Sequence, residues 1–251
     1  MNAVMIDPIE IRTQFIPSII WQKNDSIADT DLDNTVHIWK IKVPEHFCSL
    51  FKEYRHILNS KEYEKAKNFH WEDDFRSYLT GRMVLRILLS KYLDISALDI
   101  EFGASGTKPT IHKNDNLKFN LSYSGEYILI SLSKTETGID IEKINPKFDY
   151  KSLLESCFAG DENQFILADS KNSRRNFFLQ WTRKEALLKY TGQGIIDNLI
   201  IVPSMDGTRS ITESGLDLHE DLQVVSFDIS QDCVGTIAYP RHLKTVKYYT
   251  W

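Results

Sequence analysis

Two acidic residues alternate with apolar ones in the segment GIDIE at 138–142. Successive side chains of an extended strand point to opposite faces, so Asp140 and Glu142 share one face and the two isoleucines share the other. Like charges this close repel each other unless a cation lies between them, and Mg²⁺ prefers a couple of carboxylate oxygens supplemented by water and substrate phosphate. A charged edge strand facing solvent explains the same pattern, and for an isolated Asp-x-Glu it is the more common case.

A second charged motif, WTRKEALLK at 181–189, has the apolar spacing of a helix. Glu185 follows Trp181 by four residues and therefore lies on the same side of the helix, where burial is expected. A metal or a proton-transfer role would explain a carboxylate there, and Lys184 and Lys189 are close enough along the helix to hold phosphate. The alternative is an ordinary surface ion pair between Glu185 and Lys189, worth a few tenths of a kcal/mol.

A third motif, FNLSYSG at 119–125, predicts a strand that runs into a turn. Ser122, Ser124 and the backbone amides of the turn could bind phosphate. An ordinary hairpin connection with polar turn residues fits the same segment.

Basic side chains precede these motifs, notably Lys65, Arg82 and Lys108. Arg82 lies three residues from Leu79 and from Leu85, close to the apolar side of a predicted helix. A guanidinium group suits bidentate recognition of phosphate or stacking on a base. Solvated surface charge is the alternative for each of these residues.

The elements that position these residues follow from the apolar periodicity. We expect a long helix over 71–92 and a second helical block over 150–190, broken near residues 160 and 170. Gly192 is expected to cap the end of that block. Short strands are expected at 98–102, 118–122, 127–133, 137–144, 199–203, 223–229 and 233–239, the first four forming an antiparallel meander.

Composition limits the classes of protein to which the chain can belong. The chain has 251 residues, 42% of them apolar, and a formal net charge of −5. It is long enough for a large core, and its acidity argues against a nucleic-acid or membrane binder that uses its whole surface, while leaving room for a local basic pocket. Three cysteines without Cys-x-x-Cys spacing predict reduced thiols and a cytoplasmic protein. No apolar run approaches the roughly 20 residues of a membrane span, and HExxH, GxSxG and Walker motifs are missing.

Taken together and in order, the motifs resemble the 4'-phosphopantetheinyl transferase superfamily, specifically its larger monomeric, surfactin-synthetase-activating type. Two elements, GIDIEKI at 138–144 and WTRKEALLK at 181–189, match the family's two carboxylate motifs. Three others, FNLSYS at 119–124, GTKP at 106–109 and LTGR at 79–82, resemble upstream elements of the family. The resemblance spans about residues 60 to 195.

This resemblance implies a reaction and a set of residue roles. Phosphopantetheine would pass from coenzyme A (CoA) to a serine of an apo acyl or peptidyl carrier protein of secondary metabolism, with Mg²⁺ as cofactor and adenosine 3',5'-bisphosphate as the product released. The implied catalytic residues are Asp140, Glu185 and Lys189, and the implied metal ligands are Asp140, Glu142 and Glu185, with Glu185 as ligand, general base or both. The implied CoA contacts are Lys184 and Lys189 on the pyrophosphate, Ser122 and Lys65 on the 3'-phosphate, and Arg82 and Lys108 on the nucleotide and its phosphates.

Tyr123 departs from the family pattern, which usually has histidine between the two serines. Tyrosine can donate one hydrogen bond but cannot become cationic, so the resemblance implies a weaker hold on the 3'-phosphate. A CoA-binding module that has lost transfer and an unrelated Mg²⁺-dependent phosphohydrolase are the alternatives. The intact set of acidic residues with Lys189 favours the active transferase.

The resemblance also implies an α+β fold built as a pseudo-twofold pair of similar halves, each with a small, mainly antiparallel sheet packed against a long helix. We expect an N-terminal half over 1–134 that holds the nucleotide and a C-terminal half over 135–251 that carries the catalytic residues. The active site is expected in the cleft between them.

Overall fold

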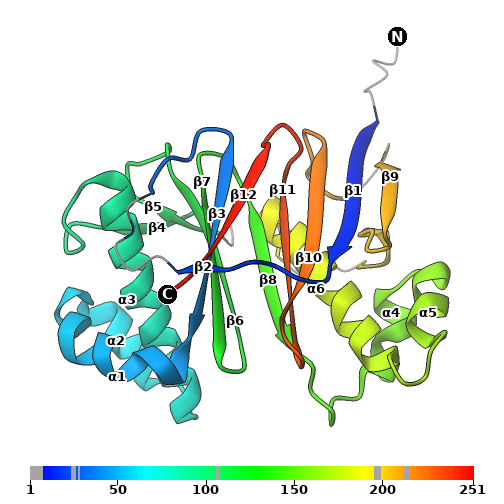
Figure 1. The fold of residues 1–251 in the computed structure, drawn as a ribbon, viewed down its shortest axis with the longest axis horizontal. Coiled ribbons are helices and arrows are strands. Elements are labelled where there is room, and N and C mark those ends of the chain that lie inside the picture. Colours follow the sequence, from blue (N-terminus) through cyan, green and yellow to red (C-terminus); the bar gives the residue numbers. More distant parts are fainter. Residues whose placement is uncertain (1–7, 24–26, 28, 106–107, 195–198, 212–214) are drawn as a thin grey trace.

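Two five-stranded sheets stand side by side in the computed structural model, and each carries a long helix on one face (Figure 1). The structure describes residues 8–23, 27, 29–105, 108–194, 199–211 and 215–251. No helix in these ranges is long and apolar enough to cross a membrane. The predicted α+β class, with two small sheets packed against helices, is confirmed.

The first sheet has the strand order β2-β12-β3-β7-β6. Its strands are β2 (Gln22–Lys23), β12 (Thr245–Thr250), β3 (Thr35–Lys42), β7 (Tyr127–Ser133) and β6 (Lys118–Ser124). Its helices are α1 (Val43–Tyr54), α2 (Ser60–Lys67) and α3 (Glu72–Leu93), with a 3-10 turn at Arg55–Ile57. A separate two-stranded sheet pairs β4 (Phe102–Ser105) with β5 (Lys108–Ile111).

The second sheet has the strand order β8-β11-β10-β1-β9. Its strands are β8 (Gly138–Lys143), β11 (Cys233–Pro240), β10 (Leu222–Ser230), β1 (Ile9–Ile16) and β9 (Gly207–Ile211). Its helices are α4 (Leu154–Cys157), α5 (Gly160–Leu167) and α6 (Ser173–Thr191), with 3-10 turns at Tyr150–Leu153 and Leu199–Ile201.

The terminal strands cross between the two halves. β1 comes from the start of the chain but lies in the second sheet, parallel to β10, while β12 comes from the end and lies in the first sheet, parallel to β3. Figure 1 shows these crossings as a blue strand within the second sheet and a red strand within the first. The predicted boundary after residue 134 therefore separates β7 from β8. It does not follow the sheets at the ends of the chain, because β1 lies in the second sheet and β12 in the first.

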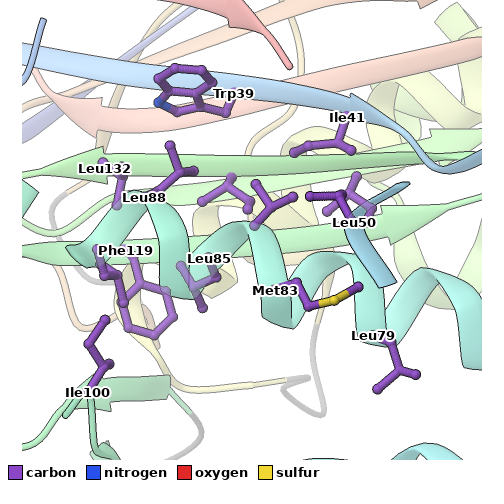
Figure 2. Packing of buried hydrophobic residues seen from close by; sticks show 14 of the residues in the cluster. Trp39, Ile41, Leu50, Leu79, Met83, Leu85, Leu88, Ile100, Phe119 and Leu132 are labelled. Atoms are coloured by element: carbon purple, nitrogen blue, oxygen red, sulfur yellow. The ribbon is translucent and has the colours of Figure 1, made fainter. Parts of the chain in front are cut away.

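The helix α3 confirms the prediction for 71–92 and forms the base of the first core. Its buried apolar side chains face the sheet, and Figure 2 shows Leu85 and Leu88 gathered with Phe119 of β6 and Leu132 of β7. Removing such surfaces from water stabilises the fold by about 25 cal/mol for each Å² of apolar area. This core holds β6 against α3 and fixes where the polar side chains of β6 emerge.

Other predicted elements are confirmed only in part. The strands at 118–122, 127–133, 137–144, 223–229 and 233–239 are present, and Gly192 caps α6 with a φ of +74°. The run at 199–203 forms a 3-10 turn, and most of 98–102 precedes β4. The expected meander is interrupted because β7 and β8 belong to different sheets.

Gly138 begins β8 where this strand passes directly under α6. A Cβ atom at this position would lie 2.0 Å from the carbonyl oxygen of Ala186 and 2.3 Å from the backbone nitrogen of Tyr190. Both atoms belong to the helix backbone, which cannot move aside as a flexible side chain would. Glycine at 138 therefore sets the distance between β8 and α6.

We predict that Gly138→Ala destabilises the protein by more than about 3 kcal/mol, because one methyl group would push α6 away from β8. Urea unfolding measures the change. Gly160→Ala is the matched control, since nothing lies within 4 Å of the added Cβ; we expect its effect to stay within about 0.5 kcal/mol. Equal stability of the two variants would contradict this account of the contact.

Candidate active site

The polar face of β8 is buried beneath α6. Ile139 and Ile141 point into the core between the sheets, whereas Asp140 points to the side on which Gly138 meets α6. Only 3% of the Asp140 surface is exposed, although β8 is the edge strand of its sheet. The alternative of a solvated, charged edge strand is therefore wrong.

Asp140 has one satisfied and one unsatisfied carboxylate oxygen. Its Oδ1 accepts hydrogen bonds from Lys189 Nζ at 2.6 Å and from Ser122 Oγ at 2.9 Å, and Lys189 Nζ also donates to Ser122 Oγ at 2.8 Å. Its Oδ2 is buried without a partner. A buried carboxylate oxygen without a protein partner costs free energy, and either a water molecule or a bound cation would satisfy it.

Strand β6 is joined to β8 by side chains, although the two strands lie in different sheets. Asn120 Oδ1 accepts from the backbone nitrogen of Ile139 at 3.0 Å. Ser124 Oγ donates to Glu142 Oε2 at 3.0 Å and accepts from the Lys143 nitrogen at 2.8 Å. Sequence reasoning gave Asn120 no role and gave Ser124 only a possible phosphate contact, yet their two-residue spacing with Ser122 places all three on one face of the strand.

Burial and mutual repulsion act on the carboxyl groups of this region. Burial, with the charge of Asp140 as a second cause, raises the pKa of Glu142 to about 7. Burial also raises the pKa of Asp140, and burial together with the charge of Asp140 raises that of Glu185. Negative charge is therefore unfavourable here, and a bound cation would relieve it.

The carboxylates do not form a ready three-residue metal site. Within the described ranges, no three His, Cys, Asp or Glu side chains gather closely enough to hold a metal ion. Glu142 lines a cavity of about 600 Å³ with Trp181, whereas Glu185 lines another of about 250 Å³ with Lys189. Asp140 and Glu142 do fit Mg²⁺, which commonly takes one or two protein carboxylates and completes its shell with water and phosphate.

Lys189 does not form the surface ion pair that its spacing from Glu185 allows. Its ammonium group bonds across to Asp140 on β8 instead, at 2.6 Å. The side chain therefore links α6 to the strand and lies within reach of any group bound at Asp140.

Lys184 corrects the sequence prediction. Its side chain is 1% exposed, and its ammonium donates to the carbonyl oxygens of Leu199 at 3.1 Å and Val202 at 2.6 Å. It also pairs with the buried Glu162 at 2.8 Å. Lys184 is thus enclosed in the second half by three acceptors and does not face the ligand region, so we do not assign it to the pyrophosphate.

Lys65 and Arg82 line one cavity of about 670 Å³ between α2, α3 and β4. Arg82 donates from Nε to Glu62 Oε1 at 2.6 Å, and its guanidinium lies 3.8 Å from the centre of the Phe102 ring. Lys65 Nζ lies 5.3 Å from the centre of the Tyr78 ring. These contacts fix the Arg82 side chain, so the alternative of a solvated surface charge is wrong for this residue. Glu62 was not among the predicted site residues, although its three-residue spacing from Asn59 is typical of the start of a helix.

Lys108 lies at the junction of the halves and lines the 250 Å³ cavity together with Glu185 and Lys189. Its ammonium bonds to Glu136 and, at 3.0 Å, to the carbonyl oxygen of Tyr190. The structure thus brings Lys108 near Lys189. The first two residues of the GTKP element, Gly106 and Thr107, lie outside the described residues.

Tyr123 packs against α3 where Gly81 leaves room for it. A Cβ atom at Gly81 would lie 2.6 Å from the Tyr123 hydroxyl. The Tyr123 side chain remains half-exposed, and the next residue after Gly81 is Arg82. Ser122 lies on the opposite face of β6, bonded to Asp140 and Lys189, so the two residues face different surroundings.

Comparison with known proteins gives two matches to family descriptions. Residues 136–238 match the 4'-phosphopantetheinyl transferase superfamily, and residues 46–135 match the N-terminal region of 4'-phosphopantetheinyl transferases. The boundary between the two matches falls between β7 and β8.

Individual relatives agree with these matches. The chain is 32% identical over 172 residues to the 4'-phosphopantetheinyl transferase HetI of Nostoc, covering 66% of this chain and 72% of the relative. It is 24% identical over 207 residues to the 4'-phosphopantetheinyl transferase Sfp of Bacillus subtilis, covering 78% of this chain and 91% of the relative. The chain therefore belongs to the 4'-phosphopantetheinyl transferase superfamily.

Proposed function

We propose that this enzyme transfers 4'-phosphopantetheine from CoA to a serine of an acyl or peptidyl carrier protein, with Mg²⁺ as cofactor. In this substitution at phosphorus, the serine oxygen forms a new P–O bond as the bond to the bridging diphosphate oxygen breaks. The serine proton goes to a base, and adenosine 3',5'-bisphosphate leaves.

One observation carries the proposal, namely the buried Asp140 with one oxygen bonded to Lys189 and the other without a partner. The first oxygen is held in place by the chain, while the second is left for a ligand outside it. Glu142, two residues along the same face, supplies a second carboxylate. A hard divalent cation suits such a pair.

Asp140 and Glu142 would hold Mg²⁺, with Glu185 as a further ligand, as the general base, or in both roles. Bound there, the ion would bind the diphosphate oxygens and neutralise the charge that develops on them during transfer. Lys189 already lies 2.6 Å from Asp140, so its ammonium can also donate to a phosphate oxygen and stabilise the leaving group.

The serine hydroxyl of the carrier needs a base because its pKa lies far above neutrality. Glu185 suits this role: it lines the cavity next to Lys189, and burial raises its pKa towards the range in which a carboxylate accepts protons effectively. Arg82, Lys65 and Lys108 would hold the nucleotide and its phosphates. The Ser122 hydroxyl is bonded to Asp140 and Lys189. The contact expected between Ser122 and the 3'-phosphate therefore stays a prediction.

We also propose that the enzyme works as a monomer in the cytoplasm on carriers of secondary metabolism. Both carboxylate motifs and the basic residues lie within one chain, so a single copy holds the residues that the mechanism uses. All three cysteines are free. Size-exclusion chromatography with light scattering tests the monomer.

We predict that the protein, incubated with CoA, Mg²⁺ and an apo carrier protein, raises the mass of the carrier by one phosphopantetheine group. Intact-mass spectrometry measures the gain, and EDTA should abolish it because the diphosphate charge is then not neutralised. CoA binding without any mass gain over a panel of carriers would favour an accessory module. Phosphate release without a carrier would favour a phosphohydrolase.

We predict that Asp140→Asn lowers the transfer rate at least about 100-fold, because it removes charge at the group that holds the metal. The fold should persist, since asparagine keeps the shape of a residue whose burial disfavours charge. Asp115→Asn is the control, because the Asp115 side chain is fully exposed. Rates come from the mass assay and Tm from calorimetry. Retained activity would show that the metal assignment is wrong.

We predict that Tyr123→His increases the preference for CoA over 3'-dephospho-CoA by about fivefold at pH 6, because a protonated imidazole can pair with the 3'-phosphate. The ratio of the two kcat/KM values measures this preference. It should decline at pH 8 as the imidazole loses its proton. Tyr127→His, on the neighbouring strand, is the control. An unchanged ratio at both pH values would place the 3'-phosphate elsewhere.

A further inference from the structure

Glu62 of α2 is a buried carboxylate shared by two arginines of α3. Its Oε1 accepts from Arg82 Nε at 2.6 Å, and its Oε2 accepts from Arg86 Nε at 3.0 Å. Its Oε2 also accepts from the backbone nitrogen of Asn59 at 2.9 Å, and the Asn59 side chain accepts in return from the Glu62 nitrogen. The Glu62 side chain is 5% exposed. The Glu62 side chain is therefore held by the start of its own helix, independently of the two arginines.

The two arginines differ in what remains of their hydrogen-bonding capacity. Arg86 is 2% exposed and also donates from one terminal nitrogen to the carbonyl oxygens of Ala97 at 2.8 Å and Ile100 at 3.0 Å. Arg82 is 11% exposed and bonds to Glu62 through Nε. Within the described part of the chain, no acceptor is bonded to the terminal nitrogens of Arg82. Arg86 thus has a structural role, whereas Arg82 keeps a free edge.

The cavity beside Arg82 has the charge that an anion needs. One carboxylate, Glu62, faces two guanidinium groups, which leaves net positive charge at a nearly buried position. Lys61 and Lys65 line the same cavity, with Glu101 as a further acidic residue. Phe102 covers one face of the Arg82 guanidinium at 3.8 Å and so limits its rotation. A phosphate group on the free edge would compensate the charge through two parallel hydrogen bonds.

We propose that Glu62 is a positioning residue for CoA recognition: it orients Arg82 so that the free edge of the guanidinium meets a phosphate group of the nucleotide. The inference rests on the proposed function and adds to it a residue that does not touch the ligand. An arginine side chain has several rotatable bonds, and holding it before binding reduces the entropy that binding must remove.

A purely electrostatic role for Glu62 predicts the opposite effect of its removal. If the carboxylate merely neutralised the arginines, a neutral residue would make the cavity more positive and strengthen anion binding. If Glu62 orients Arg82, the same change weakens binding because the guanidinium is no longer held. The sign of the change in affinity therefore separates the two roles.

The test is titration calorimetry of Glu62→Gln with adenosine 3',5'-bisphosphate, the nucleotide part of CoA. Glutamine still suits the capping position of α2, so the helix start should persist. We expect affinity to fall about tenfold, and KM for CoA to rise by a similar factor with kcat nearly unchanged. Glu64→Gln is the matched control: it removes the same charge from an exposed position of α2, where Glu64 pairs with Lys67, and should change neither value.

A double-mutant cycle distinguishes an effect of Glu62 through Arg82 from a general loss of structure. If Glu62 acts through Arg82, then Glu62→Gln should have no further effect on affinity in the Arg82→Lys background. Additive effects, unchanged affinity or tighter binding in Glu62→Gln would each overturn the positioning role. Transfer by the wild-type protein, measured alongside, distinguishes this outcome from failure of the proposed function, which would show as no transfer to any carrier.

Discussion

The side-chain bonds from β6 to β8 are the constraint on which the active-site geometry depends. The two strands belong to different sheets, and these bonds hold the two halves in register where they meet. Each half alone would present an incomplete set, because Ser122 and Ser124 come from one sheet while Asp140 and Glu142 come from the other. The close approach of β8 and α6 then adds Lys189 and fixes its distance from Asp140.

The same arrangement explains why buried acids are tolerated without destroying the fold. Taking a carboxylate out of water costs several kcal/mol unless a partner repays it. Lys189 and Ser122 compensate one oxygen of Asp140, and the second oxygen stays unsatisfied. The unsatisfied oxygen of Asp140 thus lowers the stability of the folded chain, and the packing of the core does not need a charged group at this position. In the proposed function, a cation bound with the diphosphate of CoA would remove that cost.

The sequence predicted what depends on local periodicity and missed what depends on distant pairing. Helix α3 and the shared face of Asp140 and Glu142 follow from periods of 3.6 and 2 residues. The terminal strands do not, because β1 pairs with β10, and the contact from Glu10 to Asp221 spans 211 residues. No local signal specifies such a partner. For the same reason, the side-chain link from β6 to β8 was invisible although both motifs were recognised.

The two lysines of α6 show why recognising a motif does not assign every residue in it. At about 100° per residue, positions five apart on a helix point about 140° away from each other. Lys184 and Lys189 therefore cannot both face the same ligand from a straight helix. Glu185 and Lys189, four apart, do share a side and line one cavity. Lys184 instead points into the second half, where Glu162 meets it. Adjacent residues of one motif therefore face different surroundings: Lys184 is enclosed in the second half, whereas Glu185 lines the cavity that Lys189 also lines.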